Sequence, residues 1–199
     1  MNLDDIDGLY YITHTDNLES ICQKGILSHA CARRLPHTSI AKSEVIELRK
    51  KKSVPKGRPL LEYVNLYFNP RNPMMYKVTD GGKNLGNVCL LKVDRHVLHK
   101  PGVVISDGNA ASDYTRFYAS PQGLQHLKPG EIFVTYWTDD DPVMQYRLKS
   151  TTCSEVLVPD LVARTQINQL ILPTDMHVAA VRAGIGPLEV RIDKQPFFG

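Results

Sequence analysis

Residues 10–18 read Tyr-Tyr-Ile-Thr-His-Thr-Asp-Asn-Leu, and a second informative stretch, residues 154–159, reads Ser-Glu-Val-Leu-Val-Pro. In the first stretch, aromatic and β-branched side chains lead into four polar residues, which is typical of a strand that turns into a helix. In the second, Glu155 opens an apolar strand, where a carboxylate is costly unless it lies at an edge or has a task. Together they predict a cleft between two sheets that collects polar anchors and a carboxylate.

The rest of the chain shows short strand and helix patterns in no regular order. Strands are predicted at about residues 9–13, 63–68, 88–93, 103–106, 155–158, 167–172 and 188–192. Helices are predicted from Thr15 or Asp16 up to Gly25, from Thr38 or Ser39 through the basic residues near 50, and at about 174–182 before Gly184. This order indicates a mixed α+β domain and excludes a doubly wound nucleotide fold.

Two segments are harder to assign. Residues 107–127 are polar and rich in small side chains, although we expect Tyr114, Phe117 and Tyr118 to dock on the core. Residues 131–136 fit a strand or a helix equally well, because a short apolar run does not distinguish the two. The glycine-rich dinucleotide fingerprint is missing as well, since Gly184-Ile185-Gly186 precedes Pro187 and a predicted strand.

Length and composition favour one domain over residues 1–199. No apolar run approaches the roughly 18 residues that a membrane-spanning helix needs, so we expect a cytoplasmic protein without a membrane partner. The four cysteines lack metal-binding spacing and are expected to be reduced thiols. His96 and His99 have no acidic or thiol partner at ligand spacing, so no metal site is predicted.

Charge is concentrated in one segment. Residues 33–58 carry nine basic and two acidic side chains, a local net charge of +7 in a chain whose total is +3. A positive segment of this kind suits a phosphate-rich partner. A solvated helix end followed by a flexible basic loop explains the same composition.

The individual polar residues each allow two interpretations. His14 and Asn17 at one strand-to-helix corner either hydrogen-bond ribose hydroxyls or cap the helix. Glu155 is either a catalytic carboxylate or a solvated strand end. Tyr67 and Phe68 either belong to the core or stack on a nicotinamide or an unpaired base.

Taken together, these motifs resemble the DarT family of DNA ADP-ribosyltransferase toxins. The resemblance runs in order through residues 11–18, the Val-Pro pair at 54–55, residues 63–74 and residues 155–158. Its most specific part is the middle block, Tyr-Val-Asn-Leu-Tyr-Phe-Asn-Pro-Arg-Asn-Pro-Met, because fold requirements do not explain its Pro-Arg-Asn-Pro-Met end. The resemblance implies an ADP-ribosyltransferase-like α+β fold, in which two packed, mainly antiparallel sheets form a central NAD cleft with flanking helices.

The resemblance also implies an activity: transfer of ADP-ribose from NAD to a base in single-stranded DNA, without a metal, by a toxin that a DarG-like macrodomain antitoxin neutralises. The implied catalytic residues are Glu155 and Arg49. The implied NAD-binding residues are Tyr11, Thr13, His14, Asn17, Arg49, Tyr67 and Phe68, with Tyr11 standing where many members have histidine. The implied DNA-binding residues are Lys50, Lys51, Lys52, Lys56 and Arg58.

Several alternatives stay open on the sequence. Guanine is slightly favoured over thymine as the acceptor, because residues 107–127 and the loop before Glu155 depart from thymine-directed members. The rival hypotheses are a single-stranded nucleic-acid binding module without catalysis and an ADP-ribosyltransferase that acts on RNA or protein.

Overall fold

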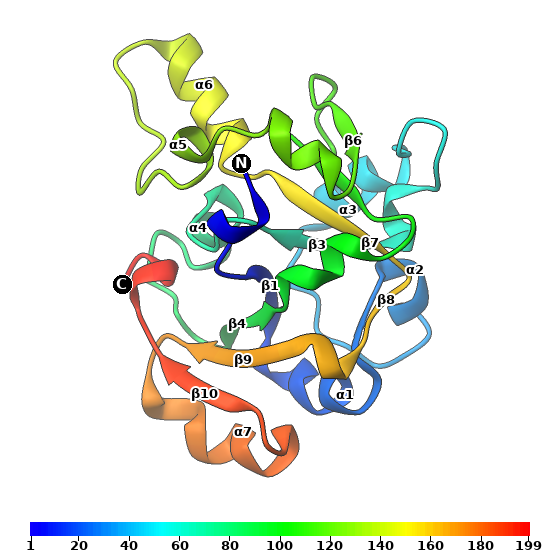
Figure 1. Cartoon of the computed structure of the whole chain (residues 1–199). Helices are drawn as coiled ribbons and strands as arrows, with labels where there is room; N and C mark the ends of the chain where they lie inside the picture. Colours follow the sequence, from blue (N-terminus) through cyan, green and yellow to red (C-terminus); the bar gives the residue numbers. More distant parts are fainter.

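A computed structural model describes residues 1–199, the side chains of His177 and Ala183 excepted. The strands are β1 (Leu9–His14), β2 (Ile26–Leu27), β3 (Tyr63–Tyr67), β4 (Val88–Val93), β5 (Val104–Ser106), β6 (Phe117–Ala119), β7 (Glu155–Pro159), β8 (Leu161–Val162), β9 (Ile167–Leu172) and β10 (Glu189–Ile192). The α-helices are α1 (Leu18–Lys24), α2 (His29–Ala32), α3 (Ser43–Lys50), α4 (Pro73–Val78), α5 (Pro129–Ile132), α6 (Pro142–Thr151) and α7 (Val178–Ile185). Figure 1 shows how they are arranged.

Eight strands form one sheet in the order β10-β9-β4-β1-β3-β7-β5-β6, while β2 and β8 pair separately. Its pairings are antiparallel except that of β10 with β9. The predicted pair of sheets is therefore one sheet of two halves. Those halves meet where β1 pairs with β3, and within the described chain this pairing consists of Tyr10 opposite Tyr67 alone. By contrast, β1 pairs with β4 along its whole length.

The two faces of the sheet carry different side chains because residues alternate along each strand. One side, the core face, carries Leu9, Leu66 and Val156, which belong to the main hydrophobic cluster together with residues of α1 and α7. The opposite side, the α3 face, carries Ile12, Tyr67 and Glu155. Helix α4 and the C-terminal 3-10 helix η8 (Gln195–Phe197) pack on the α3 face, and the side chain of Arg49 in α3 reaches Glu155 there.

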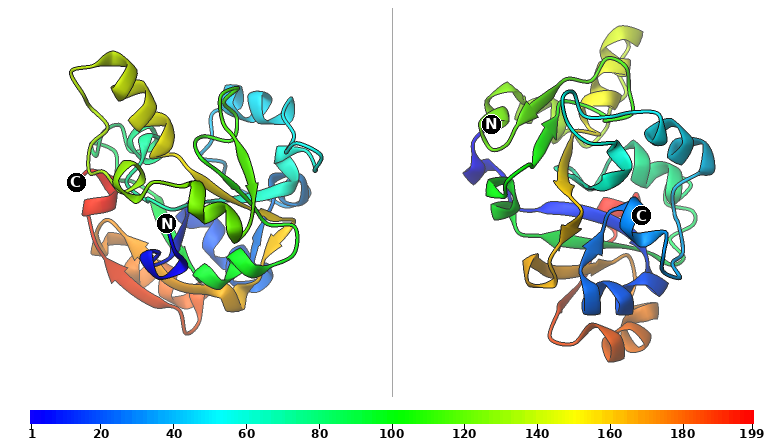
Figure 2. Two further views of the ribbon diagram at one scale, coloured as in Figure 1. Left: turned by 45° about the horizontal axis from the view of Figure 1, so that its top comes forward. Right: turned by 90° about the vertical axis from the view of Figure 1, so that its right-hand side faces the viewer.

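Residues 133–152, which include α6, project from the body of the protein in Figure 1 and in both views of Figure 2. No residue of α6 itself is buried. A pair of hydrogen bonds from Arg147 to Glu131, at 3.1 and 2.7 Å, connects α6 to α5. We refer to residues 133–152 as the excursion. It leaves the body after α5 and ends three residues before Glu155.

Most strand predictions are confirmed, and several helix predictions need correction. The second predicted helix begins at Ser43 rather than near Thr38, because residues 37–42 are irregular backbone in which Asn17 holds Thr38 through two hydrogen bonds. Helix α7 continues through Gly184, and Gly186 supplies the left-handed stop at φ 61°. The segment 131–136 is the end of a short helix followed by irregular backbone. Tyr114 is 83% exposed, so its predicted docking on the core is wrong.

None of the helices in the described chain has the length and apolar character that a bilayer crossing requires.

Candidate active site

Glu155 is a charged side chain in the interior. It opens β7, is 1% exposed and lies opposite Tyr67 of β3 in the sheet register. Its backbone N–H donates to the Ser106 hydroxyl oxygen at 3.1 Å, and that hydroxyl donates to the Gly108 carbonyl at 2.8 Å. A buried carboxylate of this kind needs specific partners, because its burial without them would cost several kcal/mol.

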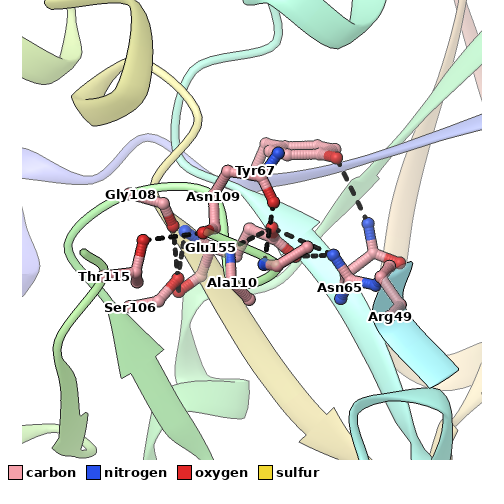
Figure 3. A network of polar contacts seen from close by, with 10 residues as sticks. Arg49, Asn65, Tyr67, Ser106, Gly108, Asn109, Ala110, Thr115 and Glu155 are labelled. Atoms are coloured by element: carbon pink, nitrogen blue, oxygen red, sulfur yellow. Dashed lines mark hydrogen bonds and ion pairs between the residues drawn. The ribbon is translucent and has the colours of Figure 1, made fainter. Parts of the chain in front are cut away.

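Two groups from distant parts of the chain satisfy the carboxylate (Figure 3). The Nη1 atom of Arg49 lies 3.1 Å from both carboxylate oxygens, and the backbone N–H of Ala110 donates to Oε1 at 3.0 Å. Charge-assisted hydrogen bonds of this kind are shorter and stronger than neutral ones. Helix α3, the loop after β5 and the start of β7 thus converge on Glu155 and fix its orientation.

Arg49 is itself enclosed, with 13% of its side chain exposed. Burial lowers the pKa of this guanidinium, but the charge and hydrogen bonds of Glu155 outweigh that effect, so the pKa is raised. Its other terminal nitrogen, Nη2, is buried and has no hydrogen-bond partner among the described residues. Buried polar atoms in native proteins are nearly always hydrogen-bonded, so this N–H group is suited to an acceptor oxygen supplied by a ligand.

Tyr67 is the aromatic side chain beside this pair. Its hydroxyl accepts a long hydrogen bond from the Asn65 amide at 3.4 Å. Burial raises the pKa of Tyr67 well above its ordinary value, and the negative charge of Glu155 raises it further. The phenol therefore stays neutral at physiological pH. Phe68 follows Tyr67 directly, so it points to the opposite side and is packed in the main hydrophobic cluster at 1% exposure.

His14 lies at the end of β1 on the α3 face. Its Nδ1 accepts a hydrogen bond from the Asp16 backbone at 3.2 Å, which caps the 3-10 helix η2 (Thr15–Asn17). His14 also lines a pocket of about 380 Å³, whose wall includes Val45 of α3 together with Lys42 and Lys77. Val45 and Arg49 lie one helical turn apart, a rise of about 6 Å. Helix α3 therefore links the His14 pocket to the Glu155 carboxylate.

The other residues predicted from β1 are placed differently. Asn17 uses its amide to hold the backbone of Thr38, donating at 2.8 Å and accepting at 2.9 Å, so it fixes the approach to α3. Thr13 is buried, and its hydroxyl accepts from Asn17 at 3.1 Å. Tyr11 packs against the main hydrophobic cluster, where burial raises its pKa to about 12. Tyr11, Thr13 and Phe68 thus lie on the core face, away from Glu155.

The five basic residues predicted to bind DNA lie at the C-terminal end of α3 and in the segment that follows it. Lys50 pairs with Glu47 at 3.6 Å, Lys52 pairs with Asp113, and Arg58 pairs with Glu62 and Asp160 at 2.9 and 2.7 Å. Lys51 and Lys56 are exposed and form no ion pair with the described side chains. Exposed pairs are weak, so all five amines and guanidinium groups remain able to meet phosphates.

Sequence reasoning missed Ser106 and the backbone N–H of Ala110. Ser106 ends a strand that the sequence did predict, but its position opposite Glu155 depends on the pairing of β5 with β7, which no local sequence pattern indicates. The contact of Ala110 comes from the backbone, so no side chain marks it in the sequence. Among the described residues, no three His, Cys, Asp or Glu side chains converge on a point that could hold a metal ion.

Comparison with known proteins gives these features a context. The sequence profile of a family described as "ssDNA thymidine ADP-ribosyltransferase, DarT" matches residues 10–198. A DNA ADP-ribosyl transferase–DNA ADP-ribosyl glycohydrolase fusion protein of Thermosipho africanus is 30% identical over 194 residues, which cover 96% of this chain and 48% of that protein. The chain therefore spans about half the length of this relative.

Solved structures of similar fold are consistent with this family match. The DarT of Thermus sp. 2.9 in complex with ADP-ribosylated ssDNA superimposes with a TM-score of 0.82 at 26% identity, covering 97% of both chains. The same protein in complex with carba-NAD+ gives a TM-score of 0.75 at 25% identity, covering 96% of this chain and 98% of that one. Fold and sequence thus define the class, that of the DNA ADP-ribosyltransferases. Within it, the chain belongs to the DarT family, and the resemblance drawn from its sequence motifs is confirmed.

Proposed function

We propose that this chain is the catalytic domain of an enzyme that transfers ADP-ribose from NAD to a base in single-stranded DNA. The observation that carries the proposal is the buried Glu155 carboxylate, held at 3.1 Å by an arginine whose second terminal nitrogen finds no acceptor among the residues that the structure describes. The Thermus protein with the same fold binds carba-NAD+ and ADP-ribosylated ssDNA. Membership of the family does not by itself identify the substrates of this chain. The geometry of Glu155 and Arg49 is what suits NAD and single-stranded DNA.

The substrate dinucleotide fits the residues present. A pyrophosphate oxygen would satisfy Nη2 of Arg49 while Nη1 keeps its bond to Glu155. The pocket beside His14 would take the part of the dinucleotide that extends along α3, with Lys42 and Lys77 supplying positive charge. Of the predicted NAD-binding aromatic residues, Tyr67 lies on the face of Glu155 and is the one we assign to the nicotinamide end. A divergence of β1 and β3 beyond Tyr10 and Tyr67 would open the sheet for this substrate.

The chemistry needs few groups. When the bond between nicotinamide and ribose breaks, its electron pair leaves with nicotinamide and positive charge develops on the ribose. A fixed carboxylate beside that charge stabilises the transition state electrostatically, and Glu155 supplies it. A ring or exocyclic nitrogen of the acceptor base then forms the new bond to the ribose, and its proton passes to Glu155 or to solvent.

The acceptor strand would follow the positive segment around α3. Lys50, Lys51, Lys52, Lys56 and Arg58 offer phosphate contacts, so binding should weaken steeply as salt increases. The excursion carries exposed tyrosines, Tyr136 and Tyr146, that can stack on unpaired bases. Asp139 and Asp141 at its tip are occupied in turns and in the cap of α6, so the tip itself does not suit phosphates.

The test is to incubate the protein with NAD and a short single-stranded oligonucleotide and to follow the oligonucleotide by mass spectrometry. An added ADP-ribose, localised by fragmentation, supports the proposal and names the base. Residues 107–127 and the loop before Glu155 depart from thymine-directed members of the family, which favours guanine as the acceptor base. The description of the matching family names thymidine. Parallel reactions contain duplex DNA, RNA and protein extract. Modification of protein or RNA alone, or binding without transfer, would overturn the assignment to DNA.

We propose further that the enzyme is a cytoplasmic toxin with a DarG-like macrodomain antitoxin. The Thermosipho relative joins a transferase to a DNA ADP-ribosyl glycohydrolase, so addition and removal of the modification occur in one protein there. Expression of this chain should arrest growth, and co-expression of such a macrodomain should restore it. Growth arrest that a Glu155→Gln variant still causes would contradict a toxic transferase activity.

A further inference from the structure

The Pro-Arg-Asn-Pro stretch after β3 is the specific motif that the proposed catalytic residues leave unexplained. Together with the preceding Asn69 this stretch spans residues 69–73, which we call the motif; it lies at the base of the excursion, and Phe68 separates it from Tyr67. The Asn72 side chain caps α4 by accepting from Met75 at 3.0 Å and donates to the Asn69 carbonyl at 2.8 Å. The Asn72 side chain thus fixes both this turn and the start of α4, while the side chains of Asn69 and Arg71 reach the backbone at the start of the excursion.

Asn69 and Arg71 hydrogen-bond the backbone at the start of the excursion. The Asn69 amide donates to the carbonyls of Ile132 at 2.8 Å and Val134 at 3.2 Å, and its oxygen accepts from the Arg71 backbone at 2.9 Å. The Arg71 Nε donates to the Thr135 carbonyl at 3.3 Å. Two side chains of the motif thus hold the carbonyl of the last residue of α5 and two carbonyls of the irregular backbone that follows it.

Arg71 also joins the excursion to the C-terminus. Its guanidinium lies 4.0 Å from the ring centre of Phe198 and 5.3 Å from that of Tyr136, and Nη1 donates to the Gln195 carbonyl. A planar guanidinium can stack on rings and direct several N–H groups at once, which lysine cannot copy. Where the chain leaves the excursion, a backbone hydrogen bond from Met74, the residue after Pro73, partly opposes the burial that raises the pKa of the Cys153 thiol to about 12.

We propose that Asn69 and Arg71 are positioning residues for the acceptor strand: they set the direction of the excursion, and the excursion presents the single-stranded substrate to Glu155. This rests on the proposed function, because it assigns the excursion to the acceptor rather than to NAD. Asn69 and Arg71 hydrogen-bond the backbone where the excursion begins, and Tyr136, which Arg71 contacts, is 64% exposed there. The motif itself needs no contact with either substrate.

The experiment compares Arg71→Gln and Arg71→Lys with the wild type. Arg95→Gln is a matched control, because Arg95 also binds two backbone carbonyls, those of Leu3 and Ile6, at 3.2 and 3.1 Å, but far along the chain from the excursion. The first readout is amide hydrogen exchange. Exchange across residues 133–152 should accelerate on the order of tenfold in Arg71→Gln, with residues 155–159 unchanged, as expected for a local opening.

The second readout is kinetic. The KM for the oligonucleotide should rise on the order of tenfold in Arg71→Gln, which is the loss of about one charge-assisted hydrogen bond, and less in Arg71→Lys. The KM for NAD and the rate of nicotinamide release without DNA should not change. Unchanged exchange in residues 133–152, a parallel rise in both KM values, or an equal effect of Arg95→Gln would overturn the proposal. If the wild type modifies no oligonucleotide, the proposed function fails, and the exchange readout still decides whether Arg71 holds the excursion.

Discussion

Strands β1 and β3 present two faces that differ in what they hold. On the core face, Leu9, Leu66 and Phe68 are almost fully buried among apolar side chains. On the α3 face, Tyr67 lies opposite a buried carboxylate, and His14 lines a pocket. Adjacent residues of one motif therefore do unrelated things, because successive side chains of a strand point to opposite sides. In a family motif that forms a strand, every second residue can face the site, and the residues between them pack in the core.

The largest expected effect is the loss of stability on substitution of a buried residue of the core face. Phe68→Ala should lower the free energy of unfolding by about 3–5 kcal/mol, because it removes a buried ring and leaves a cavity. Urea denaturation followed by circular dichroism measures this loss. Transfer activity per folded molecule should stay near the wild-type value, since Phe68 points away from Glu155. A selective rise in the KM for NAD, with the stability retained, would place Phe68 at the dinucleotide instead.

Much of the fold follows from local sequence. The aromatic and β-branched runs of β1, β3, β4, β7 and β9 were predicted close to their observed bounds, because the pattern in each reflects burial on one or both faces. Helix α6 was not predicted, since no residue of it is buried and no apolar stripe marks it. Helix α4 was hidden by its prolines, although Asn72 as cap and Pro73 at the first helical position are a recognised start signal.

The site was predictable in part for the same reason. Glu155 and Arg49 were identified through family motifs, but neither residue's local sequence says that they meet at 3.1 Å across 106 residues. Arg49 differs from Lys50 and Lys51 as the only arginine of this run, but the local sequence does not show that Arg49 is enclosed while its neighbours are exposed. The partner groups at Ser106 and Ala110 depend on the strand order of β5 and β7, which is a tertiary property.

The next largest effect is the loss of transfer activity on substitution of Glu155 on the α3 face. Glu155→Gln keeps the shape of the side chain and removes its charge, so transfer should fall by a factor on the order of 10²–10³, the effect of losing one electrostatic group at a developing charge. Single-turnover transfer to an oligonucleotide measures it, and oligonucleotide binding should persist. Glu62→Gln is the matched control, because Glu62 pairs with Arg58 at the surface. Transfer at a wild-type rate in Glu155→Gln would remove Glu155 from the mechanism.

A smaller effect sharpens the comparison within α3. Arg49→Lys keeps the positive charge, but a single amine cannot hold both oxygens of Glu155 and offer a second donor to a phosphate. The KM for NAD should therefore rise on the order of tenfold, the loss of about 1.4 kcal/mol of binding. Lys50→Ala serves as control, because its effect should appear in the salt dependence of DNA binding. An unchanged KM for NAD in Arg49→Lys would show that Nη2 does not meet the substrate.

The smallest effect compares one tyrosine on each face. Burial raises the pKa of Tyr11 to about 12, and burial together with the charge of Glu155 raises that of Tyr67. Glu155→Gln should therefore lower the pKa of Tyr67, because Arg49 remains as an opposing charge, and should leave that of Tyr11 unchanged. NMR titration of ring-labelled tyrosines measures both, with Tyr67→Phe to assign the signal.

The same shifts set the alkaline stability. Both folded-state pKa values lie above the ordinary value near 10, so each neutral phenol contributes stability that is complete below pH 10 and is lost as the pH rises through the folded pKa. The free energy of unfolding should thus decline above pH 10, and Tyr11→Phe should reduce the decline. In Glu155→Gln the contribution of Tyr67 should shrink while that of Tyr11 stays. If Glu155→Gln shifts the pKa values of both phenols equally, Glu155 does not act on its own face alone. Successive side chains of β1 point to opposite sides, and this turns Tyr11 away from the carboxylate. An equal shift would mean that this separation has no electrostatic consequence.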